Sequence, residues 1–413
     1  MESLMERSGH EPLPTAILAG ASMVSAMPII RGLGRAGVDV RLLCAPAAAT
    51  ACSRYARRLP ADGAGSQPER WLAYLLGRES DELRGAVLLA CNDDAVELLL
   101  DHREALAEKY LLDICEPGAQ RAMLDKLATY RVAAEAGVPT PRFWPAEDAH
   151  AVEARKHQYG YPLMIKPLYA HQFKKVLRGK YLMARDFAEV MAAYRLVSSH
   201  GIEVVLLEVI PGPDDLLCSY YTYLDADGAP QFDFTKRVIR RYPEREGSGC
   251  YHITDWNPEV RDLGLKLFRQ AGLKGVANVE FKRDPRDGRL KLIECNARFT
   301  AANGLLAASG IDLGTYIYRR LVGLPQARLA DVAYAKGLRL WNPPKDFLAF
   351  LELRRDGRLD FVSWTRGVAH HHVWPYFSWS DPMPSAARLR LGAKTVVAKS
   401  VRELSGRWTT NHA

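Results

Sequence analysis

Short apolar runs alternate with amphipathic stretches along the first 115 residues of the chain. The runs TAILAG (residues 15–20) and VDVRLLCA (residues 38–45) have the length and apolar character of buried strands, and residues 25–35 between them have a helical pattern. The stretches WLAYLLGRES and ELRGAVLLACNDD continue the alternation of helix and strand. This pattern predicts an open parallel α/β domain over residues 1–115.

One glycine-rich segment in this region resembles a dinucleotide-binding fingerprint. Gly32, Gly34 and Gly37 give the spacing of that motif in GLGRAG. A true fingerprint opens a helix just after a strand, whereas this segment closes a helix just before a strand. Gly37 is better placed to end the helix, so we expect no nicotinamide or flavin site here.

From residue 116 onwards the pattern changes to longer helices and antiparallel strands. Helical patterns cover residues 117–137, 187–201 and 258–275. Residues 160–167 and 202–212 predict strands, and residues 215–243 predict a long hairpin that turns at Asp227-Gly228. The last ~85 residues are rich in Trp and Pro, and we expect them to pack against the rest of the chain.

The amino-acid composition of the chain indicates how many domains it can form and which kinds of ligand it favours. The chain has 413 residues, of which 48% are hydrophobic and 25% charged, enough to build packed cores in two or three domains. Its formal net charge of +8 favours anionic ligands such as nucleotides. The basic residues are dispersed rather than clustered, so we expect no nucleic-acid partner.

The chain shows no pattern of a membrane-bound or disulfide-bonded protein. Its start, MESLMERSGHEPLP, lacks the apolar core of a signal peptide, and no apolar run is long enough for a membrane span. The seven cysteines are odd in number and form no CxxC motif. We therefore expect reduced thiols in a cytoplasmic protein.

The stretch VEFKRDPRDGRLKLIECNARF, residues 279–299, predicts a β-hairpin, because two strand-like runs flank the turn signal DPRDGR. If Asp284 pairs with Leu290, the loop covers residues 285–289 and Glu280 lies directly opposite Glu294. Alternation then gives a polar face of Asn278, Glu280, Lys282, Leu292, Glu294, Asn296 and Arg298. The opposite, core face has Ala277, Val279, Phe281, Ile293, Cys295 and Ala297.

Two carboxylates that lie directly opposite each other repel, and a divalent cation would remove that repulsion. Carboxylate and side-chain carbonyl oxygens suit Mg²⁺, and Arg298 on the same face could hold a phosphate beside the metal. The alternative is an ordinary amphipathic hairpin that tolerates an acidic pair, since exposed charge pairs contribute little free energy. The hairpin alone leaves both interpretations open.

Several residues occur in the order that is typical of the ATP-grasp superfamily. The ordered set comprises Lys126 in MLDK, Lys166 in YPLMIKP, Glu208 in LLEVIPGPDD, Glu280 in VEF, and Glu294 with Asn296 in IECNARF. No single motif is specific, but the ordered set is strong and spans residues 115–325. Over nearly the whole chain, FTKRVIRRYP, GSG, the hairpin and SWSDPMP resemble the carboxylate–amine ligase subgroup that includes D-aspartate ligase.

The resemblance implies a fold and a division into domains. Residues 1–115 would form the Rossmann-like pre-ATP-grasp domain, with a parallel sheet. Residues 116–325 would form an α+β ATP-grasp domain, whose small lobe (residues 125–210) and large lobe (residues 211–325) clasp ATP. Residues 326–413 would be a mixed C-terminal segment that packs on this core.

The resemblance also implies the roles of individual residues. Lys126 and Lys166 would contact the ATP phosphates, which suit lysine point charges. Adenine would be read by Glu208 and the backbone of Val209 and Ile210, and the ribose would be held by Asp215 or its neighbour Asp214. The implied Mg²⁺ ligands, for which Mn²⁺ is an alternative ion, are Glu280, Glu294 and Asn296. Arg298 would face the transferred phosphoryl group.

Lys236 and Arg237 are predicted to hold an acyl phosphate. They belong to a basic stretch with Arg240 and Arg241, which on a surface would be an ordinary solvated face. On a regular strand Arg237 and Arg241 share one face, so only a subset of the four can enter a cleft.

Two further segments contain lysine or histidine residues that could have a role. Residues 168–181, LYAHQFKKVLRGKY, correspond to the loop over ATP but contain a single glycine, and Lys174, Lys175 or Lys180 could close over the nucleotide. A surface position is expected for His171 in that loop. In the run 370–372, three consecutive histidines on a strand cannot share a face, so a metal site is not expected there.

We therefore expect an ATP-dependent ligase that activates a carboxylate as an acyl phosphate and couples it to an amine, releasing ADP and phosphate. The carboxylate would come from an amino acid or small acid, and the amine from an amino acid, peptide or cell-wall precursor. Relatives of this kind often form homodimers. One alternative is an ATP-binding regulatory protein with a degenerate ATP-grasp site. A nucleic-acid binder, suggested by the pI of about 9.0, leaves the acidic pair unexplained.

Overall fold

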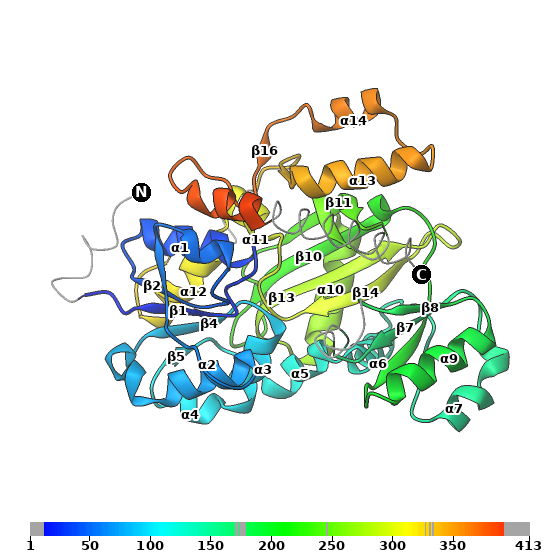
Figure 1. The fold of residues 1–413 in the computed structure, drawn as a ribbon, viewed down its shortest axis with the longest axis horizontal. Coiled ribbons are helices and arrows are strands. Elements are labelled where there is room, and N and C mark those ends of the chain that lie inside the picture. Colours follow the sequence, from blue (N-terminus) through cyan, green and yellow to red (C-terminus); the bar gives the residue numbers. More distant parts are fainter. Residues whose placement is uncertain are drawn as a thin grey trace, which may run out of the picture.

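The computed structural model describes residues 12–169, 173, 179–244, 247–326, 328–329, 332 and 334–391. These residues form three sheets of five, four and seven strands. In Figure 1 the five-stranded sheet lies at one end of the molecule and the four-stranded sheet at the other, with the seven-stranded sheet between them. Both the parallel first domain and the two-lobed α+β fold expected from the sequence are confirmed.

The first domain is a parallel sheet in the order β3-β2-β1-β4-β5. Its strands are β1 (Ala16–Ala19), β2 (Val40–Leu43), β3 (Ala56–Arg58), β4 (Val87–Ala90) and β5 (Leu111–Leu112). Its helices are α1 (Ala26–Arg35), α2 (Gln67–Leu76), α3 (Asp93–Asp101) and α4 (Arg103–Ala107). Gly37 follows the end of α1 with a φ of 84°, as expected of a residue that ends a helix.

The small lobe is a four-stranded antiparallel sheet in the order β6-β9-β7-β8. Its strands are β6 (Phe143–Pro145), β7 (Leu163–Pro167), β8 (Leu182–Ala184) and β9 (Val204–Glu208), with α7 (Ala149–Ala154) and α9 (Phe187–Ser198) against one face. The single helix predicted over residues 117–137 is wrong: it is two helices, α5 (Pro117–Leu124) and α6 (Lys126–Glu135). Asp125 separates them because its carboxylate accepts the backbone NH of Ala128 and caps α6.

The large lobe is built on the seven-stranded sheet, in the order β14-β13-β10-β11-β12-β15-β16. Its strands are β10 (Leu217–Leu224), β11 (Phe234–Tyr242), β12 (Ser248–Thr254), β13 (Gly275–Arg283), β14 (Leu290–Asn296), β15 (Arg339–Trp341) and β16 (His372–Val373). Its helices are α10 (Pro258–Ala271), α11 (Asn303–Ala308) and α12 (Leu313–Leu321), and α10 packs on one face through Val260, Leu265 and Phe268. Short 3-10 turns lie at Ala49–Cys52, Arg78–Leu83, Lys156–Gln158 and Asp214–Leu216.

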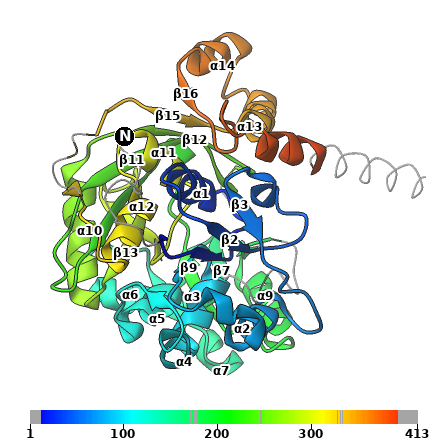
Figure 2. The same cartoon turned by 90° about the vertical axis from the view of Figure 1, so that its left-hand side faces the viewer.

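The C-terminal segment extends the large lobe. Strands β15 and β16 add to its edge, and α13 (Pro343–Arg355) and α14 (Phe361–Val368) lie above β11 in Figures 1 and 2. Asp346 of α13 fixes this arrangement, because its buried carboxylate accepts Nε and Nη2 of Arg240 at 2.6 and 2.9 Å. The same carboxylate accepts the indole NH groups of Trp341 and Trp364. A buried charge with this many partners is well compensated.

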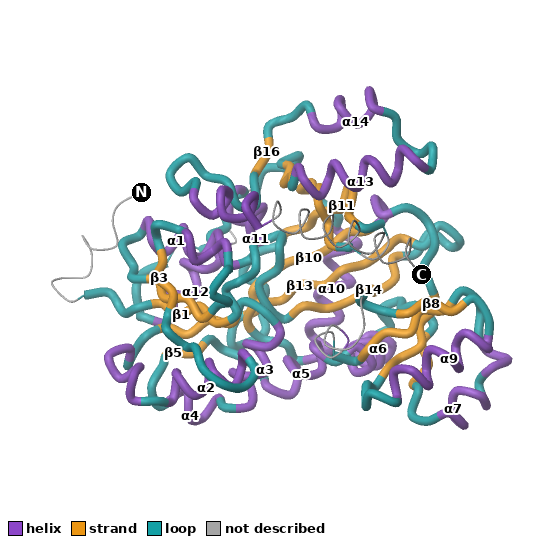
Figure 3. Tube along the Cα trace, viewed as in Figure 1, coloured by secondary structure: helices purple, strands orange, loops and turns teal. Residues whose placement is uncertain are grey.

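One apolar core joins the first domain to the large lobe. Ile29 and Ile30 of α1 pack with Leu305 and Ile317 from the two helices that follow the hairpin. A side chain at Gly314 would come within 2.7 Å of Ile29, so the absence of one lets α1 and α12 approach closely. Figure 3 shows helices beside each of the three sheets, with α1, α11 and α12 between the strands of the first domain and those of the large lobe. This contact brings the first domain beside the hairpin.

Candidate functional site

Glu280 of β13 and Glu294 of β14 are directly paired across the two strands. Asn278 and Asn296 form the next pair on the same face, with Val279 and Cys295 between them. The face that carries the glutamates is opposite to the one that packs on α10, where Val279 and Phe281 are fully buried. The opposed acidic pair expected from the sequence is therefore present.

The predicted register nearer the turn is wrong. Arg283, not Asp284, pairs with Leu290, and Leu292 pairs with Phe281. A bulge between Glu280 and Phe281 places one extra residue, Ile293, on β14. Leu292 therefore lies in the core rather than on the polar face to which alternation assigned it. The bulge restores the pairing of the two glutamates despite the shifted turn.

The two glutamates differ in their electrostatic surroundings. Burial raises the pKa of Glu280, Lys236 opposes that rise, and Glu294 adds to it. Burial also raises the pKa of Glu294, but Lys166, Lys180, Lys126 and other cations outweigh it, so this pKa lies below its ordinary value. One carboxylate is therefore held ionised while its neighbour is harder to ionise.

The cations come from separate elements of the small lobe. Lys126 is the first residue of α6, and its ammonium donates to the carbonyl of Leu168 at 3.2 Å. Lys166 lies near the end of β7, and burial lowers its pKa to about 8, although Glu294 raises it. Burial likewise lowers the pKa of Lys126, with Glu294 again opposing. The structure thus brings both predicted phosphate-binding lysines beside the acidic pair.

Lys236 and Arg237 do not lie together. Glu280 pairs with Ser219 on β10, and Ser219 pairs with Lys236 on β11. All three side chains therefore lie on the face of the sheet that carries the two glutamates, which we call the site face. Burial lowers the pKa of Lys236, and Glu280 raises it. Arg237 lies on the opposite face, where it contacts Asp255 at 3.3 Å with 42% of its side chain exposed. The prediction that both residues hold an acyl phosphate is supported by this geometry for Lys236 alone.

Arg241 approaches the site although regular alternation would group it with Arg237. Two register shifts in the β11–β12 pairing, on either side of Arg240, account for the change of face. Its guanidinium contacts the buried carboxylate of Asp214 at 2.8 Å and influences the pKa of Glu280. Asp215 is exposed. Of the two aspartates proposed for the ribose, Asp214 is already in an ion pair, and Asp215 stays a prediction.

Glu208 ends β9 with its carboxylate turned away from the lysines. Lys166 pairs with Val205, three residues from Glu208, so Lys166 and Glu208 lie on opposite faces of the small sheet. The carboxylate accepts the backbone NH of Arg142 at 3.0 Å and contacts Arg286 of the hairpin turn at 2.8 Å. A role in reading adenine would therefore fall to the backbone of residues 208–210. The carbonyl of Ile210 already accepts Lys282 at 3.1 Å.

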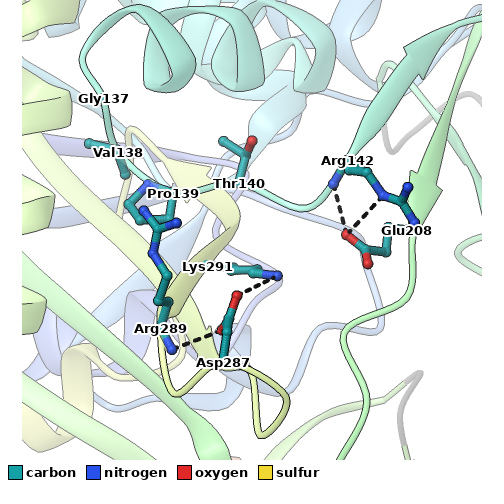
Figure 4. Close-up of a pocket in the computed structure, with 9 residues that line it drawn as sticks. All are labelled: Gly137, Val138, Pro139, Thr140, Arg142, Glu208, Asp287, Arg289 and Lys291. Atoms are coloured by element: carbon teal, nitrogen blue, oxygen red, sulfur yellow. Dashed lines mark hydrogen bonds and ion pairs between the residues drawn. The ribbon is translucent and has the colours of Figure 1, made fainter.

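A cavity of about 390 Å³ opens beside this carboxylate, at the junction of both lobes (Figure 4). Its lining carries charges of both signs and consists of Gly137, Val138, Pro139, Thr140, Arg142, Glu208, Asp287, Arg289 and Lys291. Neither the opposed glutamates nor the phosphate-binding lysines belong to it. The residues of the predicted nucleotide site therefore lie outside this cavity, at the face of the seven-stranded sheet that carries Glu280 and Glu294.

Arg298 follows the hairpin and reaches the first domain. Its Nε and Nη2 donate to the two carboxylate oxygens of Asp93, the first residue of α3, and the Nη2 contact is 2.9 Å. Its Nη1 donates to the carbonyl of Phe299 at 3.2 Å. Sequence reasoning missed Asp93, because 205 residues separate the partners and the contact arises from domain packing.

His252 is a second residue that sequence reasoning missed. It lies on β12, two residues from Thr254, which pairs with Lys236, so it shares the site face. Burial lowers the pKa of its imidazole to about 3, and the nearby ammonium of Lys236 adds to the effect. Its ring occupies the space where a side chain at Gly249 would lie. The ring is therefore neutral, and the absence of a side chain at residue 249 is the only sequence signal for its placement.

The residues present suit a magnesium ion. Glu280 and Glu294 supply opposed carboxylates, and Asn296 supplies an amide oxygen on the same face. Asn278, paired with Asn296, is 1% exposed, and its Oδ1 atom has no hydrogen-bond partner in the described part of the chain. An oxygen-rich face with an unsatisfied buried carbonyl fits a hard cation better than it fits a solvated acidic pair.

Other candidate centres are not supported. His372 is buried against Tyr251, with 3.2 Å between Nε2 and the hydroxyl, whereas His370 and His371 are exposed. In the described ranges no three His, Cys, Asp or Glu side chains gather as a metal site would require. All seven cysteines are free thiols. His171, Lys174 and Lys175 lie outside the described residues, whereas Lys180 lies within them and influences both glutamates.

Comparison with known proteins adds to this geometry. No protein-family model matches the chain. It is 23% identical over 308 residues to a D-aspartate ligase of Enterococcus faecium, covering 70% of this chain and 72% of the relative. It is 32% identical over 188 residues to a D-alanine–D-alanine ligase of Stutzerimonas stutzeri, covering 43% of this chain and 56% of that protein.

Solved structures resemble it over most of its length. The biotin carboxylase domain of the Hydrogenobacter thermophilus 2-oxoglutarate carboxylase, in complex with MgADP, has a TM-score of 0.60 at 17% identity and covers 80% of this chain and 74% of its own. An L-amino acid ligase from Bacillus licheniformis has a TM-score of 0.58 at 14% identity and covers 80% and 79%. The chain has the fold of the ATP-grasp superfamily, and its sequence resembles that of ATP-grasp carboxylate–amine ligases.

This ATP-grasp protein is an enzyme, an ATP-dependent ligase of the carboxylate–amine type that forms a C–N bond with release of ADP. The regulatory alternative is set aside, because the relatives are ligases and the charged set is intact. Within the described ranges, every helix is too short or too polar to cross a bilayer.

Proposed function

We propose that this ligase activates a carboxylate as an acyl phosphate on the face of β13, β10 and β11 that carries Glu280 and Lys236, and then transfers the acyl group to an amine. A carboxylate oxygen of the substrate attacks the γ-phosphorus of ATP, and ADP leaves. The amine then attacks the acyl carbon, inorganic phosphate leaves, and the amine nitrogen loses a proton.

The observation that carries this proposal is the convergence of cations on an opposed acidic pair. Lys126, Lys166, Lys236, Arg241 and Arg298 come from both lobes and surround Glu280 and Glu294. The excess positive charge suits a triphosphate and the charge that spreads over a moving phosphoryl group. A solvated hairpin would have no reason to collect these residues.

Each group has a task in this scheme. Glu280, Glu294 and Asn296 would hold Mg²⁺, which when bound neutralises charge on the phosphate oxygens. Lys126 and Lys166 hold phosphates from the small lobe, and Lys236 holds the acyl phosphate. No side chain acts as a nucleophile, so positioning and charge neutralisation supply the catalysis.

The substrates are amino-acid-like. The relatives named above act, by their names, on D-aspartate, D-alanine or L-amino acids, which supports an amino acid or a small acid as the activated carboxylate. The amine would belong to an amino acid, a peptide or a cell-wall precursor. Fold alone does not fix either substrate.

A hydroxylamine trap tests the proposal. Purified protein is incubated with MgATP, hydroxylamine and one acid at a time from a panel of amino acids and dicarboxylates. The proposal predicts hydroxamate together with an equal amount of ADP for one acid or a narrow group. ADP formation that no acid stimulates, with no hydroxamate from any member of the panel, would contradict activation as an acyl phosphate.

A further inference from the structure

Asp93 lies at the point where the first domain meets the phosphoryl site. It follows the carboxyl end of β4, and β4 is the neighbour of β1 in the order β3-β2-β1-β4-β5. The winding of the sheet reverses between these two strands, and ligands of open parallel sheets bind outside the strand ends at such a point. The first domain thus turns its ligand-facing edge towards Arg298.

The loops after β1 and β4 are fitted closely together. Gly20 follows β1 with a φ of 75°, and a side chain there would come within 2.0 Å of Oδ1 of Asn92. Asn92 in turn caps α3, since its Oδ1 accepts the backbone NH of Ala95 at 2.9 Å. The backbone just before Asp93 is therefore held in place by packing and by hydrogen bonds.

The contact between Asp93 and Arg298 occupies one edge of the guanidinium group and does not use all of its N–H donors. Arginine has five N–H donors. Asp93 accepts one from Nε and one from Nη2, and Phe299 accepts one from Nη1. Among the residues that the structure describes, two donors of Arg298 have no acceptor, one on each terminal nitrogen, which is the arrangement that binds a phosphoryl group or carboxylate at two points.

Asp93 is a negatively charged group close to the cations Lys126 and Arg298. It influences the pKa of Lys126, which burial lowers and which Glu294 and then Asp93 raise. It is therefore within electrostatic reach of the same cluster. When Glu280 and Glu294 hold a cation, Asp93 is the carboxylate that balances Arg298 directly.

We propose that Asp93 is a positioning residue for phosphoryl transfer: it fixes the guanidinium of Arg298 so that its two unused donors face the transferred group. The inference rests on the proposed function and adds to it, because it makes the phosphoryl site depend on the first domain. It also gives a reason for the close packing of that domain against the large lobe.

The test uses a phosphoryl mimic, so it needs no knowledge of the substrates. The affinity of the full chain for MgADP is measured by calorimetry with and without fluoroaluminate, in the wild type, Asp93→Asn, Arg298→Ala and the double variant. Asp94→Asn, which removes the same charge one residue further along α3, is the matched control. Thermal unfolding of every variant checks that each is folded.

We expect Asp93→Asn to weaken the fluoroaluminate complex by about 10-fold to 100-fold, as misplacement of a catalytic group does, and to change the affinity for MgADP alone less than twofold. In the Arg298→Ala background the same change should have an effect of less than twofold, because the group that Asp93 positions is gone.

Equal losses in both backgrounds, or an unchanged fluoroaluminate affinity in Asp93→Asn, would overturn the inference and leave the proposed function intact. Absence of MgADP binding in the wild type would instead contradict the proposed function itself. If Asp93→Asn fails to fold, Asp93→Glu is used: it keeps the charge but lengthens the side chain, and it should weaken the mimic less than Arg298→Ala does. An equal or greater weakening would count against the inference.

Discussion

Glu280 and Glu294 lie directly opposite each other across β13 and β14, and their pKa values are shifted in opposite directions. Burial makes Glu280 harder to ionise, whereas the surrounding cations hold Glu294 ionised. A pair that shares its charge in this way is unfavourable by itself and is relieved by a divalent cation. The strained pair and the cations around it are therefore best explained together, as one nucleotide site.

Removal of Glu294 should abolish turnover without unfolding the protein. Glu294→Ala takes away the ionised member of the pair, and we expect phosphate release to fall by about 10³-fold or more. The measurement is phosphate release with MgATP and the acid identified by the hydroxamate trap. Glu153→Ala, which changes an exposed glutamate of α7, should retain wild-type activity. Turnover in Glu294→Ala would remove the metal assignment.

Deprotonation of Lys166 should reduce the activity of the enzyme at alkaline pH. Burial lowers its pKa to about 8, so its ammonium is present below that pH and is lost as the pH rises through it. The kcat/KM for ATP should therefore fall about tenfold for each pH unit above this value.

Lys166→Arg, whose guanidinium stays charged, should lack that decline between pH 8 and 10. The comparison variant is Lys156→Arg, which alters an exposed lysine of the small lobe and should keep the wild-type profile. A decline that persists unchanged in Lys166→Arg would show that another group is responsible.

Asp346 should be a principal anchor of the C-terminal segment. Its carboxylate is fully buried and receives Arg240, Trp341 and Trp364. Asp346→Ala leaves the Arg240 charge buried without a partner, and the expected loss is about 3–5 kcal/mol in the free energy of unfolding. Urea unfolding measures it, with exposed Asp356→Ala as the control. A loss below about 1 kcal/mol would contradict this role, since that is the range of exposed ion pairs.

Asp284 should make the free energy of unfolding depend on pH in the acidic range. Hydrogen bonds from Arg286, and then from Lys291, lower its pKa well below the ordinary value. A group with a lowered pKa in the folded state stabilises the protein above its unfolded pKa of about 3.9, and this contribution is lost as the pH falls below that value. Asp284→Asn should therefore be less stable than the wild type at pH 7, with a smaller difference at pH 3.5.

Urea unfolding of both proteins at the two pH values provides the comparison. Asp227→Asn, in the exposed turn between β10 and β11, serves as the control and should differ little from the wild type at either pH. A gap between Asp284→Asn and the wild type that is as wide at pH 3.5 as at pH 7 would refute the assignment of this effect to Asp284.

Much of the fold could be predicted from the local pattern of apolar, polar and turn-forming residues. Parallel strands in the first domain follow from short apolar runs between helices. The hairpin follows from the turn signal, but its predicted register was wrong by one residue at the turn, and the bulge beside Glu280 is what brings the two glutamates opposite each other. The helix end at Gly37 was predicted correctly, because the place of a glycine relative to helix and strand is a local property. The helices α13 and α14 were missed, although Asn342-Pro343 and Asp360 are helix-start signals.

The rest depends on irregularities and on distant contacts. A bulge moves Leu292 to the core, and register shifts in β11 move Arg241 to the site face, and alternation alone predicts neither. Asp93 meets Arg298 only because two domains pack together. These are tertiary effects, and no window of sequence around either residue contains them.

A crystal structure with a non-hydrolysable ATP analogue, and with Mn²⁺ in place of Mg²⁺, tests the proposed nucleotide site most directly. We expect an anomalous peak between the carboxylates of Glu280 and Glu294, in contact with phosphate oxygens, with Lys126 and Lys166 on those phosphates. Glutamates that point apart without a metal, with the nucleotide bound elsewhere or not at all, would contradict the site.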